Sequence, residues 1–153
     1  MIAVLQRVNR AAVRVEGRVV GEIDKGLLVL LGVGKGDTRE DADRLAAKIA
    51  ACRIFCDAAD KMNLSLVDIA GGALVVSNFT LLADYSHGNR PSYFDAAPPA
   101  EAEALYRYFT EVLGTRINQI ATGEFGADMK IEMEADGPVT ITMDSNVLKQ
   151  GRR

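Results

Sequence analysis

The first segment whose side chains could take part in a reaction is a run of four residues that interrupts an apolar stretch. Ser77, Asn78, Phe79 and Thr80 bring hydroxyl and amide groups to the end of a hydrophobic run, just before a polar loop. Such groups can position a substrate or a water molecule. At a strand end they also act as caps and backbone partners, which is their more frequent role. From these residues alone, both interpretations stay open.

The second segment consists of Asp136, Gly137 and Pro138, between two apolar stretches. This combination indicates a turn. Glycine also permits close approach of the backbone, while proline fixes φ and removes an N–H group, so the segment could equally form a stiff wall. Only about 5–6% of X-Pro bonds in folded proteins are cis. The residues by themselves therefore favour an ordinary hairpin turn.

Familiar catalytic sets are scarce in this chain. Ser77 and His87 could be combined with Asp84 or Asp95 into a serine-type triad, but the nucleophile-elbow pattern is missing. His87 is the one histidine and lies in a polar loop. Because metal sites need several ligands, we expect no metal centre.

Length and charge limit the classes of partner. The chain has 153 residues, enough for one domain with a proper core, and a formal charge of −3. The negative charge argues against broad binding to nucleic acid, and we expect no DNA partner. Two basic groups remain, and they are either solvated surface or a small patch for one RNA end. They are Arg7, Arg10, Arg14 and Arg18 near the start, and Lys149, Arg152 and Arg153 at the end.

Membrane association and export are not indicated. The longest apolar run, residues 26–33, is far shorter than the roughly 20 residues that a membrane span requires. The first residues have the pattern of a strand and lack the basic region and cleavage site of a signal peptide. We therefore expect a cytoplasmic protein.

The apolar pattern predicts a single α+β domain over residues 1–153. It should contain mostly antiparallel sheets in barrel-like β/β/α layers, with two main helices packed on one side. We expect helices over residues 38–55, capped by Thr38, and from about residue 98 to Gly114. Predicted strands cover residues 1–8, 11–15, 18–23, 26–33, 73–82, 116–121, 129–134 and 139–143, with breaks at 9–10 and 16–17.

Apolar positions at helical spacing predict what each helix buries. Cys52 and Cys56 lie four residues apart, so we expect them on one face of the first helix as buried free thiols. In the second helix, the expected buried stripe comprises Leu105, Tyr108, Phe109 and Val112.

Several separated segments, in a fixed order, resemble one known family nearly from end to end. They cover residues 5–8, 26–30, 77–81, 88–92, 95–99, 123–129 and 137–140. Together they are similar to those of the D-aminoacyl-tRNA deacylases, also called D-tyrosyl-tRNA deacylases. The chain departs from the family pattern at Asn78, where glutamine is usual, and at Asp136, where asparagine is common. Asparagine at position 78 resembles the pattern of a related branch of tRNA deacylases, whose chiral selection is relaxed. These departures therefore bear on the stringency of chiral selection.

The resemblance implies an enzyme that hydrolyses the ester of a D-aminoacyl-tRNA and spares the L-form. It implies a homodimer with both active sites at the subunit interface and no metal or organic cofactor. In the family, the peptide matching Gly137–Pro138 is cis and reaches into the partner's pocket, while the segment matching residues 77–80 forms the other wall. The implied catalytic residues are Thr80, Phe79 and Ser77; those for substrate binding and chiral selection are Gly137, Pro138, Asn78 and Met129.

This set suits a reaction driven by positioning. An aminoacyl ester on a ribose diol is already activated, so the protein mainly has to place the ester and water and stabilise an oxyanion. A wall that excludes an L side chain cannot exclude glycine, because glycine has no side chain. Glycyl-tRNA mischarged on tRNA-Ala is therefore an expected second substrate. No base for Thr80 is evident nearby in sequence, and we interpret Thr80 as a positioning group in preference to a nucleophile.

Two competing functions follow from the same residues. One is a general small-ester or peptide hydrolase that uses Thr80 or Ser77, and the other is an RNA-binding module without catalysis. The missing activated nucleophile weighs against the first, and the missing basic stripe weighs against the second.

A few aromatic and basic residues have roles that the sequence leaves open. Tyr93, Phe94 and Tyr106 could stack on a base, although we expect all three in the core. Arg7 and Arg90 could contact RNA or hold the pocket loop.

Overall fold

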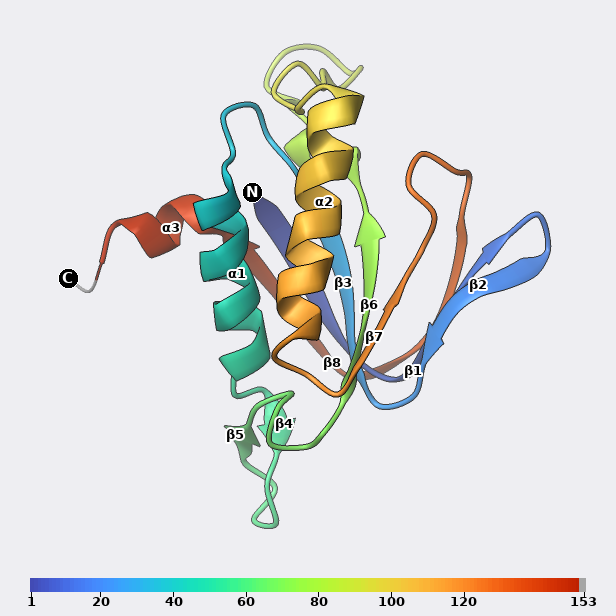
Figure 1. The fold of residues 1–153 in the computed structure, drawn as a ribbon, viewed down its shortest axis with the longest axis vertical. Helices are drawn as coiled ribbons and strands as arrows, with labels where there is room; N and C mark the ends of the chain where they lie inside the picture. The colour runs from blue at the N-terminus through green and yellow to red at the C-terminus, as the bar shows by residue number, and fades with distance from the viewer. Residues whose placement is uncertain (152–153) are drawn as a thin grey trace.

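The computed structural model describes residues 1–151 and shows a curved mixed sheet covered on one side by helices (Figure 1). The main path of the sheet runs β2-β1-β3-β6-β7. β3 and β2 pair with successive parts of one edge of β1, and β8 pairs with its opposite edge. A separate two-stranded hairpin is formed by β4 and β5. The strands are β1 (Ile2–Val15), β2 (Arg18–Ile23), β3 (Gly26–Gly32), β4 (Phe55–Cys56), β5 (Met62–Leu64), β6 (Gly72–Ser77), β7 (Gln119–Thr122) and β8 (Lys130–Asp144).

The sheet curls until its ends nearly meet, which confirms the predicted barrel-like single α+β domain. At one point β2 approaches β7 so closely that a Cβ added to Gly21 would lie 2.1 Å from the carbonyl oxygen of Thr122. Glycine is required there because any side chain would push the two strands apart.

Antiparallel pairing predominates, as expected, but one part of the sheet is parallel. β1 pairs antiparallel with β2, β3 and β8, whereas β3–β6 and β6–β7 are parallel. The carboxyl ends of β3 and β6 consequently lie at the same edge, where Leu31 pairs with Ser77. This edge carries the candidate site.

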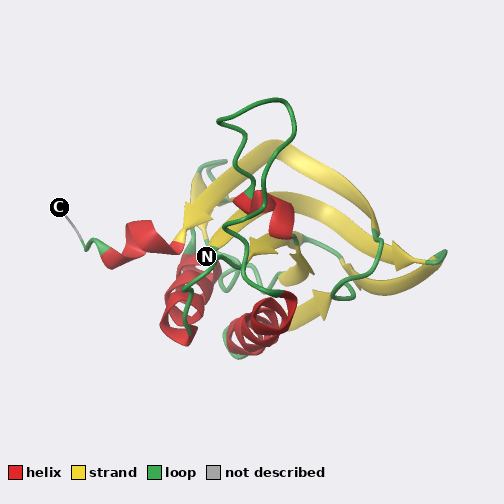
Figure 2. Ribbon diagram, turned by 90° about the horizontal axis from the view of Figure 1, so that it is seen from above, coloured by secondary structure: helices red, strands yellow, loops and turns green. Residues whose placement is uncertain are grey.

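Two long helices, α1 (Arg39–Ala51) and α2 (Pro99–Gly114), lie together on one face of the sheet (Figure 2). Thr38 caps α1 in a capping box with Asp41, as the sequence predicted for the cap. The buried stripe of α2 is shifted from the expected one: Phe109 is fully buried, but Leu105, Tyr108 and Val112 are half-buried at its margin. Tyr108 there donates to Asp43 of α1. The buried positions of α2 are Ala102, Tyr106, Phe109 and Leu113.

Several boundaries differ from the predictions. β1 continues through the expected break at residues 9–10, because a bulge between Val8 and Arg10 absorbs the irregularity. The hairpin turn at Glu16 and Gly17 is present, with φ of 49° and 77°. The predicted strand over 73–82 ends at Ser77 and continues as a 3-10 helix, η1 (Phe79–Leu82).

The prediction for the two cysteines was wrong. Helix α1 ends at Ala51, so Cys52 is its C-cap, whereas Cys56 belongs to β4. Cys52 is half-buried and Cys56 is exposed. The two thiols therefore do not share a helix face, and neither is fully buried.

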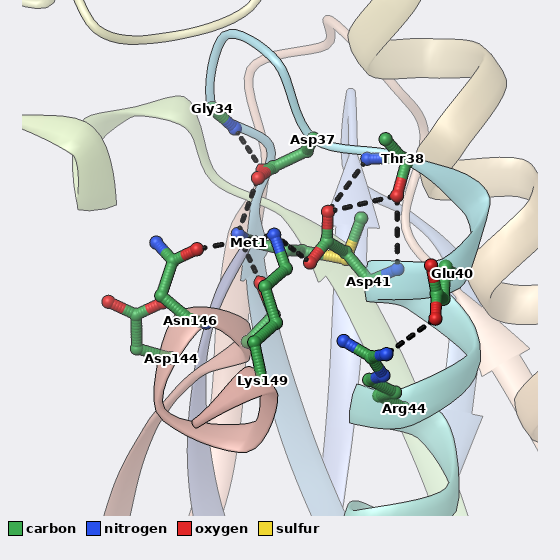
Figure 3. A network of polar contacts seen from close by, with 11 residues as sticks. Met1, Gly34, Asp37, Thr38, Glu40, Asp41, Arg44, Asp144, Asn146 and Lys149 are labelled. Atoms are coloured by element: carbon green, nitrogen blue, oxygen red, sulfur yellow. Dashed lines mark hydrogen bonds and ion pairs between the residues drawn. The ribbon is translucent and has the colours of Figure 1, made fainter. Parts of the chain in front are cut away.

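A short third helix, α3 (Ser145–Lys149), was not predicted and is tied to α1 by a buried carboxylate (Figure 3). Asp41 is fully buried; one carboxylate oxygen lies 2.7 Å from Lys149 Nζ and the other accepts a 2.9 Å bond from the Thr38 N–H. Burial acts to raise the pKa of Asp41, but the bonds from Lys149, Thr38 and Ser145 outweigh it and lower the pKa to about 2.

No helix within residues 1–151 is long and apolar enough to cross a membrane.

The pKa of Asp41 predicts how stability depends on pH. Because the folded pKa lies below the value of about 4 in an unfolded chain, the ionised carboxylate stabilises the protein above pH 4 by about 2 kcal/mol. That contribution disappears as the pH falls from about 4 to 2. Asp41→Asn should thus reduce the free energy of unfolding by about 2 kcal/mol at pH 7, with the difference shrinking toward pH 2.

Urea unfolding at a series of pH values measures this difference. Asp128→Asn removes an exposed carboxylate and should change stability by less than about 0.5 kcal/mol. An Asp41→Asn deficit that stays constant from pH 7 to 2 would contradict the assignment.

Candidate functional site

A cavity of about 640 Å³ opens at the edge where β3 and β6 end, beneath the loop that leads into α2. Its walls come from four parts of the chain: Val33 and Lys35 after β3, residues 77–79 at the end of β6, seven residues between Tyr93 and Ala102, and four residues between Phe125 and Met129 before β8. Asp95, Glu101 and Asp128 lie within these stretches but are not lining residues. The lining is largely apolar and aromatic. Ser77, Asn78, Phe79 and Met129, all expected in the site, are among the lining residues.

The segment after β6 is held by its own backbone and side chains. The Asn78 N–H donates to the Leu31 carbonyl at 2.8 Å, which keeps the segment against the end of β3. The Thr80 hydroxyl donates to Asn78 Oδ1 at 2.5 Å. An amide oxygen accepts this hydrogen bond but is too weak a base to remove the proton. The contact therefore orients the hydroxyl without activating it as a nucleophile. Thr80 is exposed beside the cavity and is not among the residues that line it.

The loop over residues 83–98 is fixed to the end of β3. The Lys35 N–H donates to the Asp95 carbonyl at 2.9 Å, and the Ala97 N–H donates to the Val33 carbonyl at 3.0 Å. Within the loop, Asp84 and Ser92 exchange two 2.8 Å backbone bonds. The cavity therefore has a roof whose C-terminal part is bonded to the segment after β3 and whose two arms are bonded to each other.

Aromatic rings stand exposed at the mouth. Phe79 is 56% exposed and packs edge-on against Tyr93, with ring centroids 5.2 Å apart. Phe94 is 75% exposed, with Lys35 Nζ 3.3 Å from its ring centroid. The core location expected for Tyr93 and Phe94 was wrong, because the loop turns both rings outward. Tyr106 is buried as expected, and its hydroxyl donates to the Val75 carbonyl.

Met129 forms part of the cavity wall, and Gly123 leaves room for it. A Cβ built on Gly123 would lie 2.6 Å from Met129 Sδ. The position of the thioether thus depends on the glycine.

Gly137 and Pro138 form an exposed elbow at a different place in the fold. The predicted hairpin is absent, because β8 runs on along β1 and bulges here. Gln6 of β1 pairs with Thr140 of β8, whereas Val8, two residues further along β1, pairs with Ala135. The residues of β8 between these two positions form the bulge. The Gly137–Pro138 peptide is cis, and Gly137 has φ of +123°.

Arg7 anchors this elbow from beneath. Its side chain is 8% exposed, and Nε lies 3.2 Å from Asp136 Oδ2 and 3.3 Å from the Asp136 carbonyl oxygen. Its Nη1 donates to the Ile54 carbonyl at 2.8 Å. Aspartate at position 136 therefore provides a charged partner for the guanidinium. Arg7 thus holds the elbow on β8 and not the loop over the cavity of its own chain, and its contact with RNA stays a prediction.

The elbow cannot reach the cavity of its own chain through the sheet. β8 is separated from β6 by β1 and β3, which amounts to three strand spacings, or about 14 Å. Gly137 and Pro138 accordingly do not line the cavity of the single chain.

The other residues considered from sequence are dispersed. His87 lies in an exposed loop, where its ring bonds with the neighbouring Ser86 and not with Ser77. Arg90 is exposed on the same loop, and Arg14 pairs with Glu132 on the sheet. Arg152 and Arg153 lie outside the described residues. Within residues 1–151, no cluster of three potential metal-binding side chains occurs.

Sequence reasoning missed Lys35 as a lining residue. Its signal was a lysine between Gly34 and Gly36, directly after a buried strand. The placement became visible only with the parallel pairing of β3 and β6, which brings residues 33–35 beside residues 77–79.

A larger hollow of about 740 Å³ lies between α2, β2 and β7. Its lining includes Glu111, Glu124 and Arg107, and this excess of carboxylate disfavours a polyanionic ligand. The smaller cavity at the β3–β6 edge contains no carboxylate among its described lining residues. It is therefore the better candidate site for a nucleic-acid ester.

Comparisons with known proteins agree with this architecture. The family described as D-Tyr-tRNA(Tyr) deacylase matches residues 4–144. A D-aminoacyl-tRNA deacylase of Thermosipho melanesiensis is 56% identical over 95% of this chain and 97% of the relative. One from Dehalococcoides mccartyi is 57% identical over 95% of each chain.

Two solved structures share the fold of this chain. One titled c-Myc DNA Unwinding Element Binding Protein superposes with a TM-score of 0.90 at 38% identity, covering 94% of this chain and 98% of the other. A probable eukaryotic D-amino acid tRNA deacylase superposes with a TM-score of 0.80 at 15% identity, over 93% and 97% of the two chains, which shows a shared fold.

These relationships place the protein among the hydrolases that cleave the ester bond of an aminoacyl-tRNA. The chain belongs to the D-Tyr-tRNA(Tyr) deacylase family. Its activity is the deacylation of D-aminoacyl-tRNA, a proofreading reaction of translation.

The contact between Gly123 and Met129 predicts a variant with a narrowed site. In Gly123→Ala, the new Cβ displaces the end of Met129, and we expect kcat/KM for D-Tyr-tRNA to fall about tenfold with little change in Tm. Replacing Met129 by Ala in the same protein removes the displaced atoms, so activity should return to that of Met129→Ala alone. Purely additive losses would show that the two positions act independently.

Proposed function

We propose that the cavity at the β3–β6 edge binds the aminoacyl-adenosine end of a tRNA, and that a second copy of the chain completes it. The single observation that carries this proposal is the Gly137–Pro138 elbow, which is exposed, anchored by Arg7, and separated by β1 and β3 from the cavity of its own chain. A stiff exposed elbow of this kind is suited to enter the cavity of a neighbouring subunit.

The edge of the sheet supports a homodimer. Within residues 1–151, β8 pairs only with β1, so one edge of a 15-residue strand has no strand partner. Long open edges of this kind are normally covered. Ile131 and Met133 on β8 and Val19 and Val20 on β2 are exposed apolar side chains whose burial would stabilise a dimer.

Chemistry in this site would rely on positioning. Phe79 and Thr80 begin a 3-10 turn, where the leading N–H groups have no acceptor within the turn. Aimed at the ester carbonyl, such groups stabilise the oxyanion that forms when water attacks. The Thr80 hydroxyl, oriented by Asn78, would place the water or the substrate, while Ser77, Asn78 and Met129 shape the wall.

Chiral selection would come from the partner's elbow. With the amine and the ester held in place, an L side chain would collide with the wall formed by Gly137 and Pro138, whereas a D side chain would point into open space. Glycine lacks a side chain and would pass, so glycyl-tRNA mischarged on tRNA-Ala becomes a second substrate. Because the substrates are charged tRNAs, we place the reaction in the cytoplasm.

Time courses with D-Tyr-, L-Tyr- and glycyl-tRNA test the elbow. Wild-type protein should hydrolyse the D and glycyl esters and spare the L ester. Pro138→Ala should raise the ratio of L to D hydrolysis at least tenfold, a loss of about 1.4 kcal/mol of discrimination. Pro91→Ala, on the exposed loop, should leave the ratio unchanged.

The same proteins examined by sedimentation test the contribution of a second subunit. A wild type that is monomeric yet still rejects L-Tyr-tRNA would exclude a cross-subunit elbow. Unaltered discrimination in Pro138→Ala would exclude the elbow itself.

Thr80 separates a positioning role from a nucleophilic one. Because its hydroxyl is bonded to an amide oxygen and not to a base, Thr80→Ala should reduce kcat by about 10- to 100-fold. Mass spectrometry after rapid quenching of the wild type should find no acyl-enzyme. A loss of more than about four orders of magnitude, together with an acylated Thr80, would establish covalent catalysis instead.

A further inference from the structure

The residues that line the candidate cavity carry one charge within the described part of the chain, and that charge is the Lys35 ammonium. This contrasts with a formal charge of −3 for the whole protein. A lone cation at the mouth of an apolar cavity attracts a specific anionic group of the ligand.

The backbone of Lys35 is fixed while its ammonium is held only loosely. The turn is closed by the bond from the Asp37 N–H to the Gly34 carbonyl and by the Asp37 carboxylate on the Gly34 N–H (Figure 3). The Lys35 N–H is bonded to Asp95 across the roof. The ammonium itself lies over the exposed face of Phe94, a contact that water and a competing anion can readily replace.

Carboxylates lie close by, but Lys35 does not pair with them. Asp37, Asp95 and Asp144 line an adjoining hollow of about 230 Å³, together with Lys35. Asp37 is bonded to the ammonium of Met1. Among residues 1–151 no carboxylate lies within ion-pair distance of Lys35 Nζ, which is left available at the mouth of the larger cavity.

The chemistry of the substrate indicates which group this ammonium meets. In an aminoacyl ester the α-carboxyl group is neutral and the α-amine is a cation when protonated, so the aminoacyl part offers Lys35 an anion only where its side chain is acidic. The anions common to every substrate are the RNA phosphates. The phosphate nearest to the ester is the one on the 5′ oxygen of the terminal adenosine.

Building on the proposed function, we propose that Lys35 binds the 5′ phosphate of the terminal adenosine and so makes the enzyme prefer RNA esters to small esters. Lys35 is then a positioning residue for the substrate's nucleotide. It leaves Phe94 when the phosphate arrives and does not touch the reacting carbonyl.

Two small substrates isolate the phosphate: 3′-O-D-tyrosyl-adenosine and its 5′-monophosphate. The wild type should show a kcat/KM about tenfold higher for the phosphorylated ester, as for one partly exposed charged contact. In Lys35→Met this ratio should fall to near one, while Lys35→Arg should keep most of it. Lys61→Met, on the distant β4–β5 hairpin, should retain the wild-type ratio (Figure 1).

The full substrate gives an independent readout. On D-Tyr-tRNA, Lys35→Met should raise KM about tenfold, and the slope of log kcat/KM against log salt should become shallower by about 0.7, as expected for one lost single-strand phosphate contact. D-Asp-tRNA should be affected as much as D-Tyr-tRNA.

Distinct failures point to distinct errors. Equal use of both small esters by the wild type, or an unchanged salt slope in Lys35→Met, overturns the phosphate contact and leaves the proposed function intact. A loss confined to D-Asp-tRNA would assign Lys35 to acidic side chains instead. A wild type inactive on D-Tyr-tRNA and on both small esters would overturn the proposed function as well.

Discussion

Strand β1 is paired on both edges along much of its length, and this pairing determines the arrangement of everything else. β8 lies along one edge, while β3 and then β2 occupy the other. Because backbone hydrogen bonds fix the neighbours of a strand, the bulge that carries Gly137 and the segment that begins at Ser77 are kept three strands apart. Neither segment can compensate for the other within one chain, which is why the elbow is exposed and the cavity remains open at its mouth.

The site that we propose contains few reactive groups. The lining is mainly apolar and aromatic, and the Thr80 hydroxyl beside it donates to the amide oxygen of Asn78. An activated ester needs orientation and a stabilised oxyanion more than a strong base. Rigid backbone suits this demand. The roof is held by backbone hydrogen bonds to Val33 and Lys35, and the elbow, which lies elsewhere on the chain, is held by the buried Arg7.

Particular elements show how far the pattern of residues reaches. The cap at Thr38, the start of α2 at Pro99 and the turn at Glu16 and Gly17 follow from local rules, and the sequence located all three. Local rules failed where a distant strand decides. The residues around Asn9 have the pattern of a break, but β8 holds them in β1 through a bulge. The segment at Gly137 has the pattern of a hairpin turn, but the residues on both sides of it pair with β1, so it forms a bulge within one strand. Cys56 was assigned to a helix and instead pairs in β4.

Composition, apolar periodicity and family motifs determined the fold class, the two helices and the family of the chain, because each of these depends on residues close together in the chain. Only the tertiary structure decided which segments meet. The parallel pairing of β3 with β6 brings Lys35 beside Ser77, and the path of the loop turns Tyr93 and Phe94 outward. Strand order and loop direction depend on contacts between residues tens of positions apart, and no local pattern of side chains encodes them.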